Sequence, residues 1–141
     1  MIAQLSIRTF EPEDMGAVID MLQDVSAYRP DADTVTTLAE AFAAQTDCQA
    51  CVAIQGGRLI AFGSLFILNR VRGGRTGIIE DVVVAQNMRG QGVGQQIVGA
   101  LIAAARARGC FKVSLEAAAS AQRFYAAGGF KAGGQAMRIM L

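Results

Sequence analysis

The sequence predicts an α+β domain, built on a mixed, mostly antiparallel sheet of about six or seven strands with about four helices. Three observations lead to this prediction. Three apolar runs follow one another closely between residues 49 and 84, a glycine-rich turn then opens a long apolar helix pattern, and a further strand pattern follows that helix. The chain has 141 residues, the usual length of one domain, so we expect a single domain over residues 1–141.

The first part of the chain predicts one strand and two helices. Residues 5–8 alternate between apolar and polar side chains, as in a half-buried strand. Pro12 stands among acidic residues and favours a helix start, and apolar residues recur at helical spacing as far as residue 22. Asp33 or Thr34 is expected to cap a second helix.

The middle of the chain predicts an antiparallel meander. Strand patterns over residues 49–55, 59–68 and 76–84 are separated by Gly56-Gly57, a two-residue hairpin signal, and by a turn around residues 72–74. These connections are too short for parallel crossovers, so the three strands should be antiparallel neighbours.

The last part of the chain predicts a crossover helix and a parallel strand. Apolar residues recur at helical spacing over residues 93–105, and the strand pattern at 111–115 must run parallel to that at 76–84 if the helix crosses over. Three shorter elements complete the prediction: a helix over 118–127 and two extended segments, 130–132 and 136–140, that give a final hairpin or strand.

The turn between the strand at 76–84 and the long helix is a candidate phosphate site. Glycines allow a ligand to approach the backbone closely, and the free N–H groups and dipole of a helix start favour an anion. The backbone that would supply these groups comprises Arg89, Gly90, Gln91, Gly92, Val93, Gly94 and Gln95.

Composition excludes several classes of function. The formal net charge is +1 without any basic run, so nucleic acid is not an expected partner. No apolar run is long enough to span a membrane and no signal peptide is recognisable, so we expect a cytoplasmic protein. The chain has no histidine, and the Cys48-Gln49-Ala50-Cys51 motif lacks further ligands for zinc, so we expect no metal and ordinary thiols.

Two motifs together resemble the GNAT (general N-acetyltransferase) superfamily. The first is Arg89-x-x-Gly92-x-Gly94 between a valine-rich strand and a helix, and the second is Phe124-Tyr125 followed by Gly129-Phe130. The resemblance covers nearly the whole chain and implies the GNAT fold. Within the superfamily, residues 79–84 and 110–116 resemble glucosamine-6-phosphate N-acetyltransferases.

The resemblance implies acetyl-CoA as the donor. The glycine turn would then hold the pyrophosphate, and the backbone of Val82, Val83 and Val84 would pair with the pantetheine arm as a strand edge does. It also implies that Tyr125 protonates the departing CoA sulfur. An ordinary phenol, with a pKa near ~10, carries that proton at neutral pH.

Carboxylates are the candidate groups for binding the acceptor amine or accepting its proton. Glu80 and Asp81 end an apolar strand and should point to opposite faces, and Glu116 ends the neighbouring parallel strand. We predict that Glu80, Asp81 and Glu116 include the groups that bind the ammonium or take its proton. The role of three arginines around the turn at residues 72–74 is open: Arg70, Arg72 and Arg75. They either belong to a solvated hairpin or bind an anionic acceptor across a dimer interface. A homodimer is the oligomeric state expected for small proteins of this type.

Two alternatives remain beside acetylation of an amino sugar phosphate. One is transfer to another small amine of the aminoalkylphosphonate, amino acid or polyamine type. The other is a non-catalytic CoA-binding module, which the alanine-rich segment 117–121 keeps open. A dinucleotide site is excluded, because a meander precedes the glycine turn and its final glycine spacing is wrong.

Overall fold

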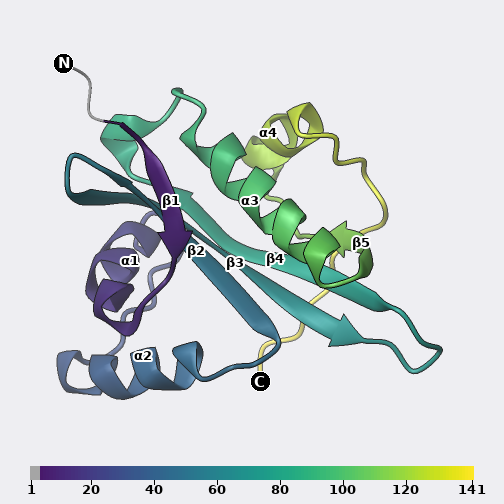
Figure 1. The fold of residues 1–141 in the computed structure, drawn as a ribbon, viewed down its shortest axis with the longest axis horizontal. Helices are drawn as coiled ribbons and strands as arrows, with labels where there is room; N and C mark the ends of the chain where they lie inside the picture. The colour runs from purple at the N-terminus through teal and green to yellow at the C-terminus, as the bar shows by residue number, and fades with distance from the viewer. Residues whose placement is uncertain (1–3) are drawn as a thin grey trace.

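The computed structural model describes residues 4–141, and Figure 1 shows one twisted sheet with helices on both faces. The strand order is β1-β2-β3-β4-β5. The first four strands are antiparallel neighbours, and β5 is parallel to β4. The strands are β1 (Ser6–Thr9), β2 (Cys48–Gln55), β3 (Arg58–Asn69), β4 (Arg75–Val84) and β5 (Cys110–Ser114).

Two helices lie on each side of the sheet (Figure 1). Helices α1 (Met15–Leu22) and α2 (Val35–Ala43) cover one face, while α3 (Val93–Ala107) and α4 (Gln122–Ala127) cover the other. Short 3-10 turns over Pro12–Asp14, Ala32–Thr34 and Ala119–Ala121 lead into α1, α2 and α4. No helix within residues 4–141 combines the length and apolar composition that crossing a bilayer requires.

Alternation along the strands separates the core into two layers. On the α1–α2 side, Phe10 meets Phe42 and Phe62 edge to face, with ring centroids 5.3 and 5.7 Å apart. On the other side, the apolar stripe of α3 packs against β3 and β4. Both faces of β3 are therefore covered, which explains its long apolar run.

Asp14 connects the 3-10 turn before α1 to strand β1. Arg8 donates to both carboxylate oxygens of Asp14 at 2.8 and 2.9 Å, and the Glu11 N–H donates to the same carboxylate at 2.8 Å. These hydrogen bonds, that from Arg8 first, hold the pKa of Asp14 below its ordinary value. The predicted helix start at Pro12 is thus confirmed, with a 3-10 turn preceding α1 proper.

The meander and the crossover are confirmed, whereas the predicted strand number is wrong. Gly56 and Gly57, both at positive φ, join β2 to β3 as a two-residue hairpin. The expected final hairpin over 130–132 and 136–140 is absent, because residues 130–141 adopt no regular secondary structure in the described part of the chain. Alternation alone predicted this hairpin, but a strand also requires a pairing partner, which the local pattern does not supply.

Candidate active site

The two parallel strands separate at one end of the sheet. The β4–β5 ladder ends at the pair Ile78↔Ser114, whereas β4 continues as far as Val84. Beyond Ile78, the backbone of β4 that faces β5 has no partner strand in the described residues. Val82, Val83 and Val84 lie in this unpaired stretch, where an amide chain has N–H and C=O groups to pair with.

A β-bulge bends β4 where the strands separate. Phe62 pairs with Val83 and Ser64 with Glu80, so Gly63 alone faces both Asp81 and Val82. Asp81 is the one non-glycine residue at positive φ among residues 4–141, with φ of 55°. The bulge breaks the strict alternation, and both Glu80 and Asp81 are exposed. The expectation that they point to opposite faces assumed a regular strand, which the bulge interrupts at this position.

Ser64 and Gly63 hold the bulge in place from β3. The buried Ser64 hydroxyl donates to the Glu80 carbonyl at 2.9 Å. A β-carbon added at Gly63 would lie 2.7 Å from Ile97 Cγ2, so α3 is seated directly on this position. Sequence reasoning missed both residues, although a glycine inside an apolar strand run is itself a signal for a bulge or close approach.

We expect Gly63→Ala to destabilise the fold by about 1–3 kcal/mol, since Ile97 and Leu101 must both move to admit the methyl group. Chemical denaturation with urea measures the change. Gly99→Ala is the matched control, because Gly99 lies in α3 with no neighbouring atom within 4 Å of the added carbon. The control should gain about 0.5–1 kcal/mol from helix propensity. Equal losses in both variants would contradict the close packing of Gly63.

The carboxylates lie at the strand separation. Partial desolvation of the exposed Glu80 side chain first, and then the negative charge of Asp81, raise the pKa of Glu80 above its ordinary value. If the register Ile78↔Ser114 is carried on by two residues, Glu80 comes level with Glu116 across the gap. Glu116 forms an ion pair with Arg138. No hydrogen bond or ion pair between residues 4 and 141 joins Tyr125 to any of the three carboxylates.

The glycine turn opens α3 as predicted. Gly90 and Gly92 have φ of 80° and 82°, and a β-carbon at either would point into open space. Gly92 is the N-cap of α3, and the first bond into the helix runs from the Gln96 N–H to the Gly92 carbonyl. The preceding N–H groups of Val93, Gly94 and Gln95 therefore have no acceptor inside the helix. The residues present fit an anion at this helix start.

Two side chains of the glycine turn, those of Arg89 and Gln95, contact other parts of the fold and do not point to an open ligand site. The Arg89 guanidinium donates to the Val84 carbonyl at 3.1 Å and to Asp24 at 3.0 Å, which directs it toward the end of α1. The Gln95 amide donates to the Phe124 carbonyl at 2.8 Å and so fastens α3 to α4. A β-carbon at Gly94 would meet the Phe124 ring at 2.9 Å, so this glycine also serves helix packing.

Tyr125 lies in α4 beside this junction. Its ring packs edge to face against Phe124 and Phe130, with centroids 4.8 and 5.7 Å away. Phe124 and Val84 both approach Gly94, which brings α4 to the end of β4 and the start of α3. Burial raises the pKa of Tyr125 above its ordinary value of 10.0, so the phenol holds its proton at neutral pH.

The predicted arginine cluster is mostly engaged within the β3–β4 hairpin. Arg70 donates to Thr76 at 3.0 Å, and Arg75 donates to Asn69 at 3.1 Å and to the Arg108 carbonyl at 2.9 Å. Arg72 has no such contact in residues 4–141. These bonds assign Arg70 and Arg75 to the hairpin structure.

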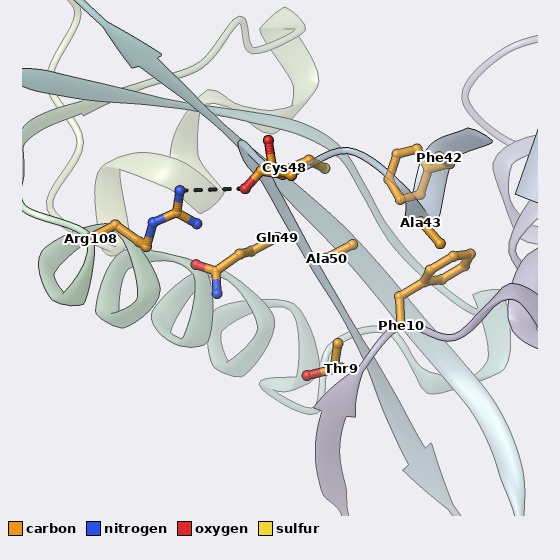
Figure 2. Close-up of a pocket in the computed structure, with 9 residues that line it drawn as sticks. Thr9, Phe10, Phe42, Ala43, Cys48, Gln49, Ala50 and Arg108 are labelled. Atoms are coloured by element: carbon orange, nitrogen blue, oxygen red, sulfur yellow. Dashed lines mark hydrogen bonds between the residues drawn. The ribbon is translucent and has the colours of Figure 1, made fainter. Parts of the chain in front are cut away.

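A cavity lies at the opposite end of α3 from the glycine turn. Figure 2 shows it between Phe10 and Phe42 on one side and Arg108 on the other, and its volume is about 310 Å³. Arg108 is paired with Asp47 at 3.2 Å. The 15 residues of α3 span about 22 Å, so this cavity is separate from the strand separation and contains none of the predicted site residues.

The three cysteines are free. Cys48 and Cys51 lie in β2 and are half-buried, and burial raises the pKa of the Cys51 thiol to about 11. No group of three or more potential ligands among His, Cys, Asp and Glu is placed to hold a metal ion within residues 4–141.

The fold and site define an acyl-CoA-type transferase scaffold: a sheet split between two parallel strands, with a glycine turn at the adjoining helix start. Residues 18–130 match the acetyltransferase (GNAT) family, and the chain therefore belongs to that family.

Curated relatives and a solved structure agree with this assignment. The chain is 42% identical over 76 residues to glucosamine 6-phosphate N-acetyltransferase 1 of Oryza sativa subsp. japonica, covering 52% of this chain and 46% of the relative. It is 40% identical over 87 residues to the Trypanosoma brucei brucei enzyme of that name, covering 60% and 59%. The chain thus aligns with about half the length of these relatives. The structure of the Arabidopsis thaliana glucosamine-6-phosphate N-acetyltransferase superposes with a TM-score of 0.88 at 26% identity, over 97% of this chain and 98% of that one.

Proposed function

We propose that the chain is an acetyl-CoA-dependent N-acetyltransferase that moves an acetyl group directly to the primary amine of a small molecule. One observation carries the proposal. The unpaired edge of β4 ends at Val84 and leads through the glycine turn into α3, so a strand-pairing surface and an anion site adjoin. A ligand with a peptide-like arm and a pyrophosphate matches that combination, and acetyl-CoA has both.

The donor would be held mainly by backbone. N–H groups of Gly90 to Gln95 would bind the pyrophosphate, and the Val82–Val84 edge would bind the pantetheine amides. Gly90 and Gly92 fit this role because a β-carbon there would project into the space the ligand needs. Acetyl-CoA supplies the activated acetyl group, and no metal is required for the transfer.

Acid and base are assigned from burial and position. Glu80, whose pKa is raised, would take the proton from the ammonium so that the neutral amine can attack the acetyl carbonyl. As the carbon–sulfur bond breaks, Tyr125 would give its proton to the sulfur, and its raised pKa keeps that proton in place at neutral pH. Asp81 lies in the bulge and its charge helps to raise the pKa of Glu80, while Glu116, two residues beyond β5, would face the acceptor.

For the acceptor we propose an amino sugar phosphate. The support is the name shared by curated relatives that are 40% and 42% identical, together with the carboxylates of Glu80 and Glu116, which follow the last β4–β5 pair on their two segments and could bind an ammonium group. We further propose that the protein acts as a cytoplasmic homodimer.

Thiol release from acetyl-CoA tests the function. We expect glucosamine 6-phosphate to accelerate release, while glucose 6-phosphate, which lacks the amine, gives the background rate. Glucosamine, which lacks the phosphate, should react with a higher KM. Calorimetry with acetyl-CoA measures donor binding separately. Binding without turnover of any amine would support a non-catalytic CoA module, and absence of binding would refute the donor assignment.

A further inference from the structure

The cavity between α2 and the far end of α3 takes no part in the proposed transfer reaction. Its volume of about 310 Å³ lies at the lower end of the range of small-ligand pockets, roughly 300–1,000 Å³. The rings of Phe10 and Phe42 form one wall, and the Arg108 guanidinium lies on the other side (Figure 2). Strand β2 passes between them at Cys48. An apolar wall, a cation and a strand therefore surround one small space.

The edge of β2 is unpaired where it borders this cavity. Strand β1 ends before it reaches Cys48, and the Phe10 N–H donates to the Ala50 carbonyl at 2.9 Å. On the β3 side, the Ile67 N–H donates to the Asp47 carbonyl at 2.8 Å. Because successive residues of a strand direct their backbone groups to opposite sides, the N–H and C=O of Cys48 point away from β3. No backbone group among residues 4–141 pairs with them there.

The aromatic wall lies on the face to which a group paired with Cys48 would direct its side chain. Residues directly opposite each other on neighbouring strands share a face, and Cys48 shares its face with Ala50. Ala50 and Phe42 both pack against the core cluster on the α1–α2 side, which includes Phe10. An apolar side chain carried by a ligand at the β2 edge would therefore lie against aromatic rings and extend this core.

Arg108 supplies positive charge to the cavity. Its Nη2 donates to the Thr46 carbonyl at 3.5 Å and to the Asp47 carboxylate at 3.2 Å, whereas Nε and Nη1 bond to no described group. The Asp47 side chain is 54% exposed, so solvent weakens this ion pair and a competing anion can replace it. A guanidinium binds a carboxylate through two parallel hydrogen bonds, which gives both energy and orientation. A carboxylate is thus the anion that this wall fits.

We propose that this cavity is a second ligand site, which binds an N-acylated apolar amino acid. The ligand's amide N–H donates to the Cys48 carbonyl, and its carboxylate accepts from the Cys48 N–H and from Arg108. Its apolar side chain lies against Phe42. The C-terminus of a peptide offers the same chemistry, so a free acylated amino acid and a peptide end are the two sources of such a ligand. The length of α3 separates this site from the glycine turn, so the ligand and acetyl-CoA can be bound together.

Titration with N-acetyl-leucine tests the site, with CoA present throughout to occupy the proposed donor site. Calorimetry gives the dissociation constant, and amide NMR should show a shift of the Cys48 resonance while those of Gly90 and Gly92 stay in place. N-acetyl-leucinamide lacks the carboxylate and 4-methylpentanoate lacks the amide, so each should bind about tenfold more weakly or worse. Absence of binding up to about 10 mM overturns the proposal, as do shifts confined to the glycine turn and Tyr125.

Two matched pairs of variants locate the binding. Arg108→Gln should raise the dissociation constant of N-acetyl-leucine about tenfold, whereas Arg106→Gln should change it less than about twofold. Arg106 lies in the last turn of α3 but outside the cavity, and its side chain makes no hydrogen bond or ion pair within residues 4–141. Ala43→Leu should abolish binding by filling the cavity, and Ala44→Leu, one residue beyond the lining, should not. Equal effects within either pair refute the site.

A tripeptide with leucine at its C-terminus separates the two sources of ligand. If it binds more tightly than N-acetyl-leucine, the site takes the end of a peptide chain, and if it binds more weakly, the site takes the free acylated amino acid. None of these readouts uses acetyl transfer, so failure here leaves the proposed activity to its own test.

Discussion

Tyr125→Phe is expected to lower kcat for acetyl transfer by about 100-fold while leaving the acetyl-CoA dissociation constant within about threefold. The substitution removes only the hydroxyl, and the ring contacts with Phe124 and Phe130 can remain. The protonated phenol is the active form. Because burial raises its pKa above 10.0, the wild-type rate should not fall through loss of this proton until the pH exceeds 10.

Steady-state kinetics of Tyr125→Phe and of a matched control variant, Tyr28→Phe, check this prediction. Tyr28→Phe removes the other tyrosine hydroxyl of the chain, and Tyr28 is 77% exposed in the connection between α1 and α2. That control should keep the wild-type kcat. An undiminished rate in Tyr125→Phe would remove the acid assignment, and a Tyr125→Phe chain with a lowered melting temperature would point to packing.

The order of elements could be predicted because it depends on local patterns. Gly56-Gly57 specifies a tight hairpin through its positive φ angles, and helical spacing over 93–105 specifies α3. The short connections then leave an antiparallel meander as the only arrangement of β2, β3 and β4. The glycine turn was located correctly for the same reason, since its position between a strand and a helix is a local property.

The structural features that could not be predicted from the sequence depend on contacts between residues far apart in the chain. The bulge at Asp81 lies opposite Gly63, on which α3 is seated, and no pattern within residues 78–84 specifies where Ile97 will lie. The contact between Arg89 and Asp24 joins residues 65 positions apart. Local alternation at residues 136–140 predicted a strand, but these residues pair with no strand in the described part of the chain, and the local pattern does not specify such a partner.

The glycine turn provides the sharpest test of donor binding. Gly92→Ala is expected to weaken acetyl-CoA binding by about 100-fold, since the added carbon would project from the turn that is proposed to hold the pyrophosphate and φ of 82° strains any side chain. The strain alone should cost about 1–2 kcal/mol of folding stability. Calorimetry measures the binding change, and thermal unfolding without ligand measures the strain.

Gly109→Ala separates these two effects. Gly109 follows α3 at its other end, has φ of 79° and also has no atom within 4 Å of an added β-carbon. Both variants should therefore lose similar folding stability, whereas only Gly92→Ala should lose affinity for acetyl-CoA. If Gly109→Ala weakened binding equally, the loss would reflect general destabilisation. If neither variant changed binding, the pyrophosphate would have to lie elsewhere than at the start of α3.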